Sequence, residues 1–139
     1  MTSIDTNVIV ALWDRDAALS SAAQRALEHA ASEGTLIISA PVFAELIAAP
    51  GRTESFVDAF LYDTGMMLDW EINEKIWRLA GRAFQRYAAK QRKQKLSGPR
   101  RILADFLIGA HAFQNRHKLL TLDQRLYRGA FPELAVTEI

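Results

Sequence analysis

Residues 35–51 read Thr-Leu-Ile-Ile-Ser-Ala-Pro-Val-Phe-Ala-Glu-Leu-Ile-Ala-Ala-Pro-Gly, and this stretch decides the class of fold. Residues 35–39 form a short apolar run rich in β-branched side chains, which predicts a buried strand. Ser39 and Pro41 then predict a helix start, because proline has no amide hydrogen to lose in the first helical turn. Residues 42–49 complete the helix, and Pro-Gly ends it. A strand that leads directly into a helix is typical of an α/β fold.

The same alternation continues on both sides of this stretch. Further strands are predicted at residues 3–5, 66–70 and 118–122, with a last short one near 135–137. Further helices are predicted at residues 8–13 with Thr6 or Asn7 as the cap, at 17–32, at 53–62, from a cap at Asn73 to about Lys93, and at 101–115 after a loop at 97–99. We therefore predict one domain over residues 1–139, a three-layer α/β/α fold with a mainly parallel central sheet flanked by helices.

Composition excludes several classes of protein. The chain has 139 residues, half of them apolar, which is enough for one continuous core. It contains no cysteine, so disulfides, thiolate zinc sites and cysteine nucleophiles are excluded. No apolar run approaches the roughly 20 residues that cross a bilayer. The first residues lack the pattern of a secretory signal, so we expect a cytoplasmic protein.

Four acidic residues lie within or directly after apolar runs: Asp5, Glu45, Asp105 and Asp123. Burial of an unpaired carboxylate is costly, so a positive partner is expected. Asp5 and Asp123 each follow a predicted strand, and the carboxyl ends of parallel strands meet at one edge of the sheet. A ligand set made only of oxygen suits a hard divalent cation, which predicts a Mg²⁺ or Mn²⁺ site at this edge.

Each acid also has a simpler structural interpretation. Asp5 and Asp123 could cap helices, since aspartate favours such positions. Asp105 could pair with Arg101, which lies one helical turn away. Glu45 lies beside the apolar stripe of its helix and could face solvent.

Positive charge is concentrated in one segment of a nearly neutral chain. Residues 75–101 contain ten of the 17 lysines and arginines and no acid. Such a segment could contact a phosphate backbone or a partner protein, or it could be a solvated helix face. The candidate binding residues are Arg78, Arg82, Arg86, Lys90, Arg92, Lys93, Lys95, Arg100 and Arg101.

Four short motifs together resemble the PIN-domain nucleases. They are Asp-Thr-Asn at residues 5–7, the mid-chain Glu45, Asp105 before Ile-Gly-Ala-His-Ala at 108–112, and Leu-Thr-Leu-Asp at 120–123. Chain length, lack of cysteine and the α/β alternation are similar to the VapC-type toxins of type II toxin–antitoxin pairs. The resemblance matches the acids of the family, in order, to Asp5, Glu45, Asp105 and Asp123. It assigns supporting roles to Thr6, Asn7 and Thr121.

The resemblance implies an endoribonuclease that depends on Mg²⁺ or Mn²⁺ and cleaves RNA phosphodiesters with metal-activated water. It also implies a homodimer and a cognate VapB-type antitoxin. In the expected mechanism Asp5, Asp105 and Glu45 hold one ion, while Asp123 completes a second site or orients the attacking water.

Two other functions are possible on the sequence alone. One is a non-catalytic RNA-binding PIN-like module that uses the basic residues 75–101. The other is a phosphatase of the haloacid dehalogenase type, although that family expects an acid two residues after the first aspartate, where this chain has Asn7.

Overall fold

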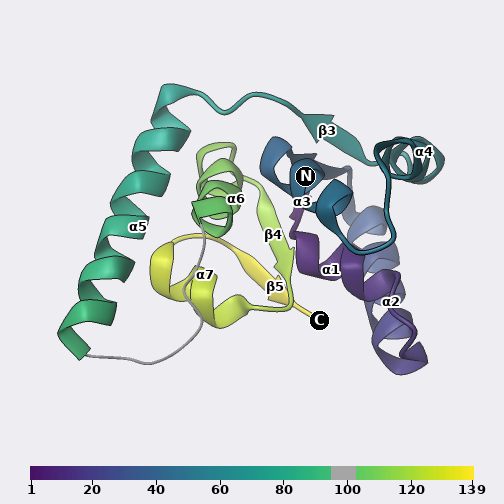
Figure 1. Cartoon of the computed structure of the whole chain (residues 1–139), viewed down its shortest axis with the longest axis horizontal. Helices are drawn as coiled ribbons and strands as arrows, with labels where there is room; N and C mark the ends of the chain where they lie inside the picture. Colours follow the sequence, from purple (N-terminus) through teal and green to yellow (C-terminus); the bar gives the residue numbers. More distant parts are fainter. Residues whose placement is uncertain (95–102) are drawn as a thin grey trace.

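A five-stranded parallel sheet forms the centre of the protein (Figure 1). The computed structural model describes residues 1–94 and 103–139. Within these ranges the strands lie in the order β3-β2-β1-β4-β5, and each neighbouring pair is parallel. Their bounds are β1 (Thr2–Ile4), β2 (Leu36–Ser39), β3 (Met67–Asp69), β4 (Lys118–Thr121) and β5 (Val136–Glu138). The predicted α/β class and parallel sheet are confirmed.

The strand order reverses beside β1. From β1 the chain moves outward through β2 to β3, and it then returns to place β4 on the other side of β1. Ile4, the last residue of β1, pairs with Leu120 near the end of β4. Ligands of open parallel sheets bind beyond the carboxyl ends of the strands at such a reversal. The chain segments that follow β1 and β4 therefore occupy the position where a site is expected.

Helices cover both faces of the sheet and complete three α/β/α layers. In Figure 1, α5, α6 and α7 lie on one side, and α1, α2 and α4 lie on the other. No helix within the described ranges is both long and apolar enough to cross a membrane. The helices are α1 (Thr6–Leu12), α2 (Ala17–Glu33), α3 (Ala40–Ala48), α4 (Glu54–Thr64), α5 (Glu74–Gln94), α6 (Leu103–Gln114) and α7 (Gln124–Ala130).

The core is built around α6. Every residue of α6 from Phe106 to Ala112 is buried, so this helix lies within the core. The one titratable residue in this run is His111, whose Nε2 lies 2.8 Å from Oδ2 of Asp69 at the end of β3. A buried polar ring is thus paired within the fold, as buried polar groups generally are.

Local signals at the helix starts were only partly right. Asn73 caps α5 as predicted, since its Oδ1 accepts a hydrogen bond of 3.0 Å from the amide of Ile76. Ser39 stands at the N-cap position of α3, but its hydroxyl is buried and has no hydrogen-bond partner in the described part of the chain. Neither Thr6 nor Asn7 caps α1, because the helix begins at Thr6 and its N-cap position is Asp5.

One element was missed and another is only partly described. The structure has a helix, α7, between β4 and β5, where the sequence pattern predicts none. A helix of seven residues shows too few turns for an apolar period to be detected. The predicted loop at 97–99 and the first two residues of the predicted helix 101–115 lie outside the described residues.

Candidate active site

Asp5 lies at the centre of the candidate site. It directly follows β1, and its amide donates a hydrogen bond of 3.0 Å to the carbonyl of Leu120 in β4. The residue is only 4% exposed. Although it occupies the N-cap position of α1, its side chain makes no capping hydrogen bond. Helix capping therefore does not explain why a carboxylate is buried here.

The surroundings of Asp5 oppose its ionisation. Its pKa is raised from 3.8 to about 6, chiefly by burial, and the negative charge of Asp105 raises it further. The hydroxyls of Thr121 and Tyr127 act in the opposite direction. A bound cation would favour the charged form of Asp5, so the position is electrostatically suited to a metal ion.

The hydroxyl of Thr121 orients Asp5 and makes every hydrogen bond that a hydroxyl can make. Its Oγ1 donates to Oδ2 of Asp5 at 2.7 Å. The same oxygen accepts from the amide of Asp123 at 2.9 Å and from Nδ2 of Asn7 at 3.4 Å. One donated and two accepted hydrogen bonds exhaust the capacity of a hydroxyl.

Asn7 connects the segments that follow β1 and β4. In addition to its contact with Thr121, its Oδ1 accepts from the amide of Leu122 at 3.1 Å. The structure thus brings Asn7, Thr121 and Asp5 together. Their role in catalysis stays a prediction.

Glu45 reaches the same region from α3. Its side chain is partly buried, and Oε1 accepts a hydrogen bond of 2.7 Å from Oγ1 of Thr6, the residue that follows Asp5. Glu45 is therefore not a free surface glutamate, which was the simpler interpretation of its position. Thr6 therefore links the second acid to the first.

Asp105 lies in the first turn of α6 and is partly buried. Its negative charge raises the pKa of both Asp5 and Tyr127, so Asp105 lies near these two side chains. The alternative partner Arg101 lies outside the described residues.

Asp123 caps α7. Its Oδ1 accepts a hydrogen bond of 3.3 Å from the amide of Leu126, so the capping interpretation holds for this acid. Because its amide also bonds to Thr121, Asp123 remains adjacent to the acidic site. Capping and a role at the ion are compatible, since a carboxylate has two oxygens.

Donor chemistry at this edge fits a divalent cation. Asp5, Glu45, Asp105 and Asp123 offer only carboxylate oxygens, the ligands preferred by Mg²⁺ and Mn²⁺. In residues 1–94 and 103–139, however, no three acidic, histidine or cysteine side chains are grouped closely enough to hold an ion. The type of ligand atom therefore suits the ion, although the carboxylates are not arranged around one point.

Tyr127 is a residue of this region that the sequence motifs do not include. This residue of α7 is 1% exposed, and its pKa is raised well above 10 by burial and by the charges of Asp5 and Asp105. It follows Asp123 by four residues, which is one helical turn, so recognition of α7 would have placed it on the same face as the fourth acid.

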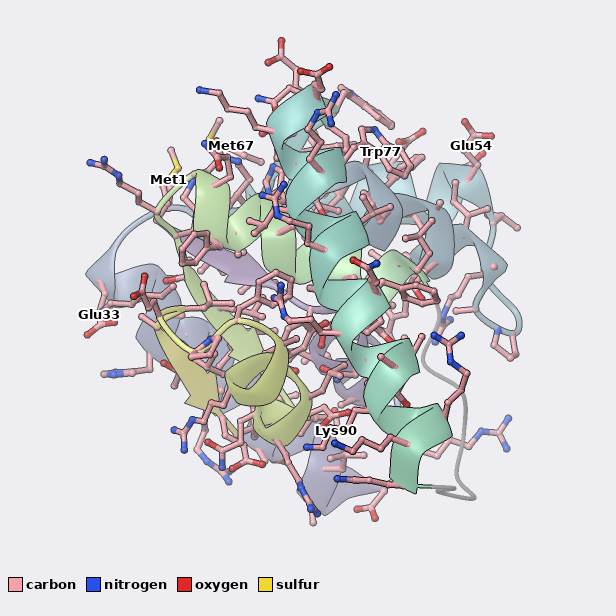
Figure 2. The ribbon with its side chains drawn as sticks, turned by 90° about the vertical axis from the view of Figure 1, so that its left-hand side faces the viewer. Met1, Glu33, Glu54, Met67, Trp77 and Lys90 are labelled. Atoms are coloured by element: carbon pink, nitrogen blue, oxygen red, sulfur yellow. The ribbon has the colours of Figure 1, made fainter. Side chains whose placement is uncertain are left out.

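Part of the basic helix α5 packs beside the start of α6. Phe84 and Tyr87 of α5 contact Phe106 of α6, with ring centroids 4.9 and 5.5 Å apart, so this part of α5 lies beside the first turn of α6. Lys90 follows Tyr87 and lies nearer the C-terminal end of α5 (Figure 2). The other basic candidates within the described residues are Arg78, Arg82, Arg86, Arg92 and Lys93, while Lys95, Arg100 and Arg101 lie outside them.

Fold and site together define an α/β domain that carries one buried acid, Asp5, and three partly buried acids at the reversal of a parallel sheet. The PIN domain family model matches residues 3–132, so the chain belongs to the PIN domain family. PIN domains are generally nucleases. The match covers all four acids and disfavours the haloacid dehalogenase alternative. Comparison with curated protein sequences finds no significant match.

Solved structures of toxin–antitoxin complexes contain chains with the same fold. VapBC2 from Rickettsia felis, bound to a DNA fragment from its promoter, gives a TM-score of 0.66 at 20% identity, covering 99% of this chain and 97% of that chain. VapBC-1 from nontypeable Haemophilus influenzae gives 0.65 at 19% identity, covering 99% and 96%. A toxin–antitoxin complex from Klebsiella pneumoniae gives 0.63 at 21% identity, covering 100% of both chains. The predicted resemblance to VapC-type PIN proteins is confirmed at the level of family and fold.

Proposed function

We propose that this PIN-domain protein is an endoribonuclease that depends on Mg²⁺ or Mn²⁺ and acts as the toxin of a toxin–antitoxin pair. The observation that carries the proposal is the burial of Asp5 at the strand reversal, with Asp105 close enough to raise its pKa further, to about 6. Carboxylates held against their own repulsion favour the binding of a cation. Membership of the PIN family supports the nuclease class.

The four acids would have two roles, which are to bind the ion and to orient the attacking water. Asp5, Asp105 and Glu45 would hold one ion, and Asp123 would complete a second site or orient the water. A divalent ion bound there lowers the pKa of water and stabilises charge that develops on the phosphate. Thr121 fixes one oxygen of Asp5 for this purpose. The products expected are a 5′-phosphate and a 3′-hydroxyl.

RNA recognition is assigned to the basic helix. Hydrolysis by ion-activated water does not require the ribose 2′-hydroxyl, so preference for RNA must come from shape, single-strandedness and basic contacts. The end of α5 that carries Lys90, Arg92 and Lys93 lies toward the first turn of α6, where Asp105 is located. A strand crossing this end would bring a phosphate to the acids.

A VapB-type antitoxin and a second copy of the chain are the proposed protein partners. The antitoxin is supported by the VapBC complexes among the structures of similar fold. Trp70 is 61% exposed and Trp77 49%, which gives α5 and the segment before it apolar surface for such contacts. A toxin acting on cellular RNA would work in the cytoplasm.

The proposed activity predicts cleavage only in the presence of a divalent ion. Purified protein is incubated with total RNA in Mg²⁺, in Mn²⁺ or in EDTA, and the new ends are mapped. We expect new 5′-phosphate ends with either ion and none in EDTA. RNA binding that persists in EDTA, without cleavage under any ion, would instead favour the non-catalytic RNA-binding module.

Ion binding should also stabilise the folded protein. A ligand present at tenfold excess over its Kd adds about 1.4 kcal/mol to the free energy of unfolding. We therefore expect millimolar Mg²⁺ to raise the melting temperature, measured by scanning calorimetry without RNA. A melting temperature that does not change would contradict an ion site formed by these acids.

Substitution of the basic end of α5 should weaken RNA binding more than chemistry. Arg92→Ala combined with Lys93→Ala is expected to raise KM with little change in kcat, because phosphate contacts act in binding. Each lost contact should make the dependence of log affinity on log salt shallower by about 0.7. The matched control is Arg15→Ala with Arg25→Ala, two exposed arginines before and within α2. An equal effect in both pairs would show that only net charge matters.

A further inference from the structure

We propose that Tyr127 is a positioning residue of the acidic site, whose hydroxyl holds the Asp5 carboxylate in its ion-binding orientation. The inference rests on the proposed function, because it concerns the same ion. It assigns a role to a side chain in α7 that the four-acid motif does not include.

The ring of Tyr127 is packed so that its hydroxyl is directed inward. The residue is 1% exposed and lies one turn after the α7 cap, Asp123. On α6 the facing residue is Gly109, and an added Cβ there would lie 3.0 Å from Cδ1 of Tyr127 and 2.3 Å from Cε2 of Phe131. The absence of a side chain at Gly109 gives the two rings their space.

The hydroxyl of Tyr127 lies near the acids but makes no hydrogen bond within the described residues. The negative charges of Asp5, Asp105 and Glu45 all act on it, so it lies near these three acids. It is buried, yet no partner in the described residues meets it at hydrogen-bonding geometry. Its proximity to Asp5 is nevertheless enough to lower the pKa of that carboxyl.

Asp5 can accept a further hydrogen bond from this hydroxyl. Thr121 donates to Oδ2, and each of the two carboxylate oxygens can accept more than one hydrogen bond. A tyrosine hydroxyl is protonated at neutral pH and can donate one hydrogen bond. Burying a hydroxyl without a partner destabilises the fold, whereas a phenylalanine would fill the same space without that cost. A small rotation of Asp5 on ion binding would complete the hydrogen bond.

The test separates this role from a structural one. Tyr127→Phe keeps the ring and removes only the hydroxyl. In EDTA its melting temperature is expected to equal or exceed that of the wild type. Its Mn²⁺ midpoint, measured by calorimetric titration without RNA, is expected to rise about tenfold, as is usual when a group that orients a metal ligand is removed. Tyr62→Phe, at an exposed position of α4, should match the wild type in both measurements.

Each other result overturns the inference at an identifiable step. An unchanged Mn²⁺ midpoint in Tyr127→Phe, with ion binding intact in the wild type, shows that the hydroxyl does not position Asp5. A lower melting temperature in EDTA with the same midpoint assigns Tyr127 a packing role alone. If the wild type itself binds no Mn²⁺, the proposed function fails, and the inference that depends on it fails with it.

Discussion

Asp5→Asn is expected to abolish RNA cleavage and, at the same time, to make the ion-free protein more stable at neutral pH. Loss of a central ion ligand removes several kcal/mol of transition-state stabilisation, which corresponds to a rate reduction of about a thousandfold or more. Stability should change in the opposite direction, because the asparagine has the same shape, can still accept from Thr121 and carries no buried charge. A gain in stability together with loss of activity is the signature of a strained functional carboxylate.

The stability effect has a defined size and pH window. Raising the pKa of Asp5 from 3.8 to about 6 means that its ionisation costs the folded state about 3 kcal/mol at neutral pH. Below pH 3.8 the carboxyl is protonated in both states, so the cost is absent there. The cost grows as the pH rises toward about 6 and is complete above it. The advantage of Asp5→Asn should therefore be small near pH 4 and largest at pH 7 and above.

Urea unfolding in EDTA from pH 4 to pH 8 measures this effect, and cleavage of RNA in Mg²⁺ measures the activity. The matched control is Asp58→Asn, an exposed aspartate of α4, which should leave both properties near those of the wild type. Wild-type cleavage by Asp5→Asn would show that the acidic site is misassigned. A destabilised variant at pH 7 would show instead that the charge of Asp5 is compensated within the fold.

The sheet and the position of Asp5 could be predicted because they depend on local pattern. An apolar run followed by a serine, alanine and proline predicts a strand and then a helix, and the repetition of this unit predicts a parallel sheet. Parallel strands share a carboxyl edge, so Asp5 and Asp123 could be placed together before any contact was known. The pairing of β1 with β4 then brings Thr121 to Asp5, although 116 positions separate them in the chain.

What could not be predicted depends on packing between distant elements. Nothing in the sequence of α7 indicates that Tyr127 is buried, because the space for its ring is provided by Gly109 on another helix. The sequence pattern also could not decide whether Asp123 caps a helix or belongs to the acidic site. In the structure Asp123 caps α7 and also lies beside the acids. At Ser39 the residue type was right for a cap, but its buried hydroxyl makes no cap bond in the described part of the chain.

Gly109→Ala is expected to destabilise the protein and to disturb the site, because the added Cβ has no space. It would lie 2.3 Å from Cε2 and 2.7 Å from Cδ2 of Phe131, which is closer than atoms in contact can approach. Overpacking of this kind costs about 1–3 kcal/mol, which outweighs the roughly 1 kcal/mol that alanine gains over glycine in a helix interior. Movement of α7 to relieve the clash would shift Tyr127 and the α7 cap together. Activity in Mg²⁺ should fall further than the loss of folded protein explains.

The same substitution at Gly81 provides the control, since an added Cβ there meets nothing within 4 Å. Gly81→Ala in α5 should stabilise the protein by up to about 1 kcal/mol, so the two alanine variants should differ in the sign of their effect on the free energy of unfolding. Phe131→Leu tests the cause, because a smaller side chain at 131 removes the atoms that clash. The double variant Gly109→Ala with Phe131→Leu should be more stable than the sum of the two single changes predicts, and the excess measures the coupling between α6 and α7. Additive effects would mean that Gly109 is needed for another reason and that α7 is not held in place by this contact.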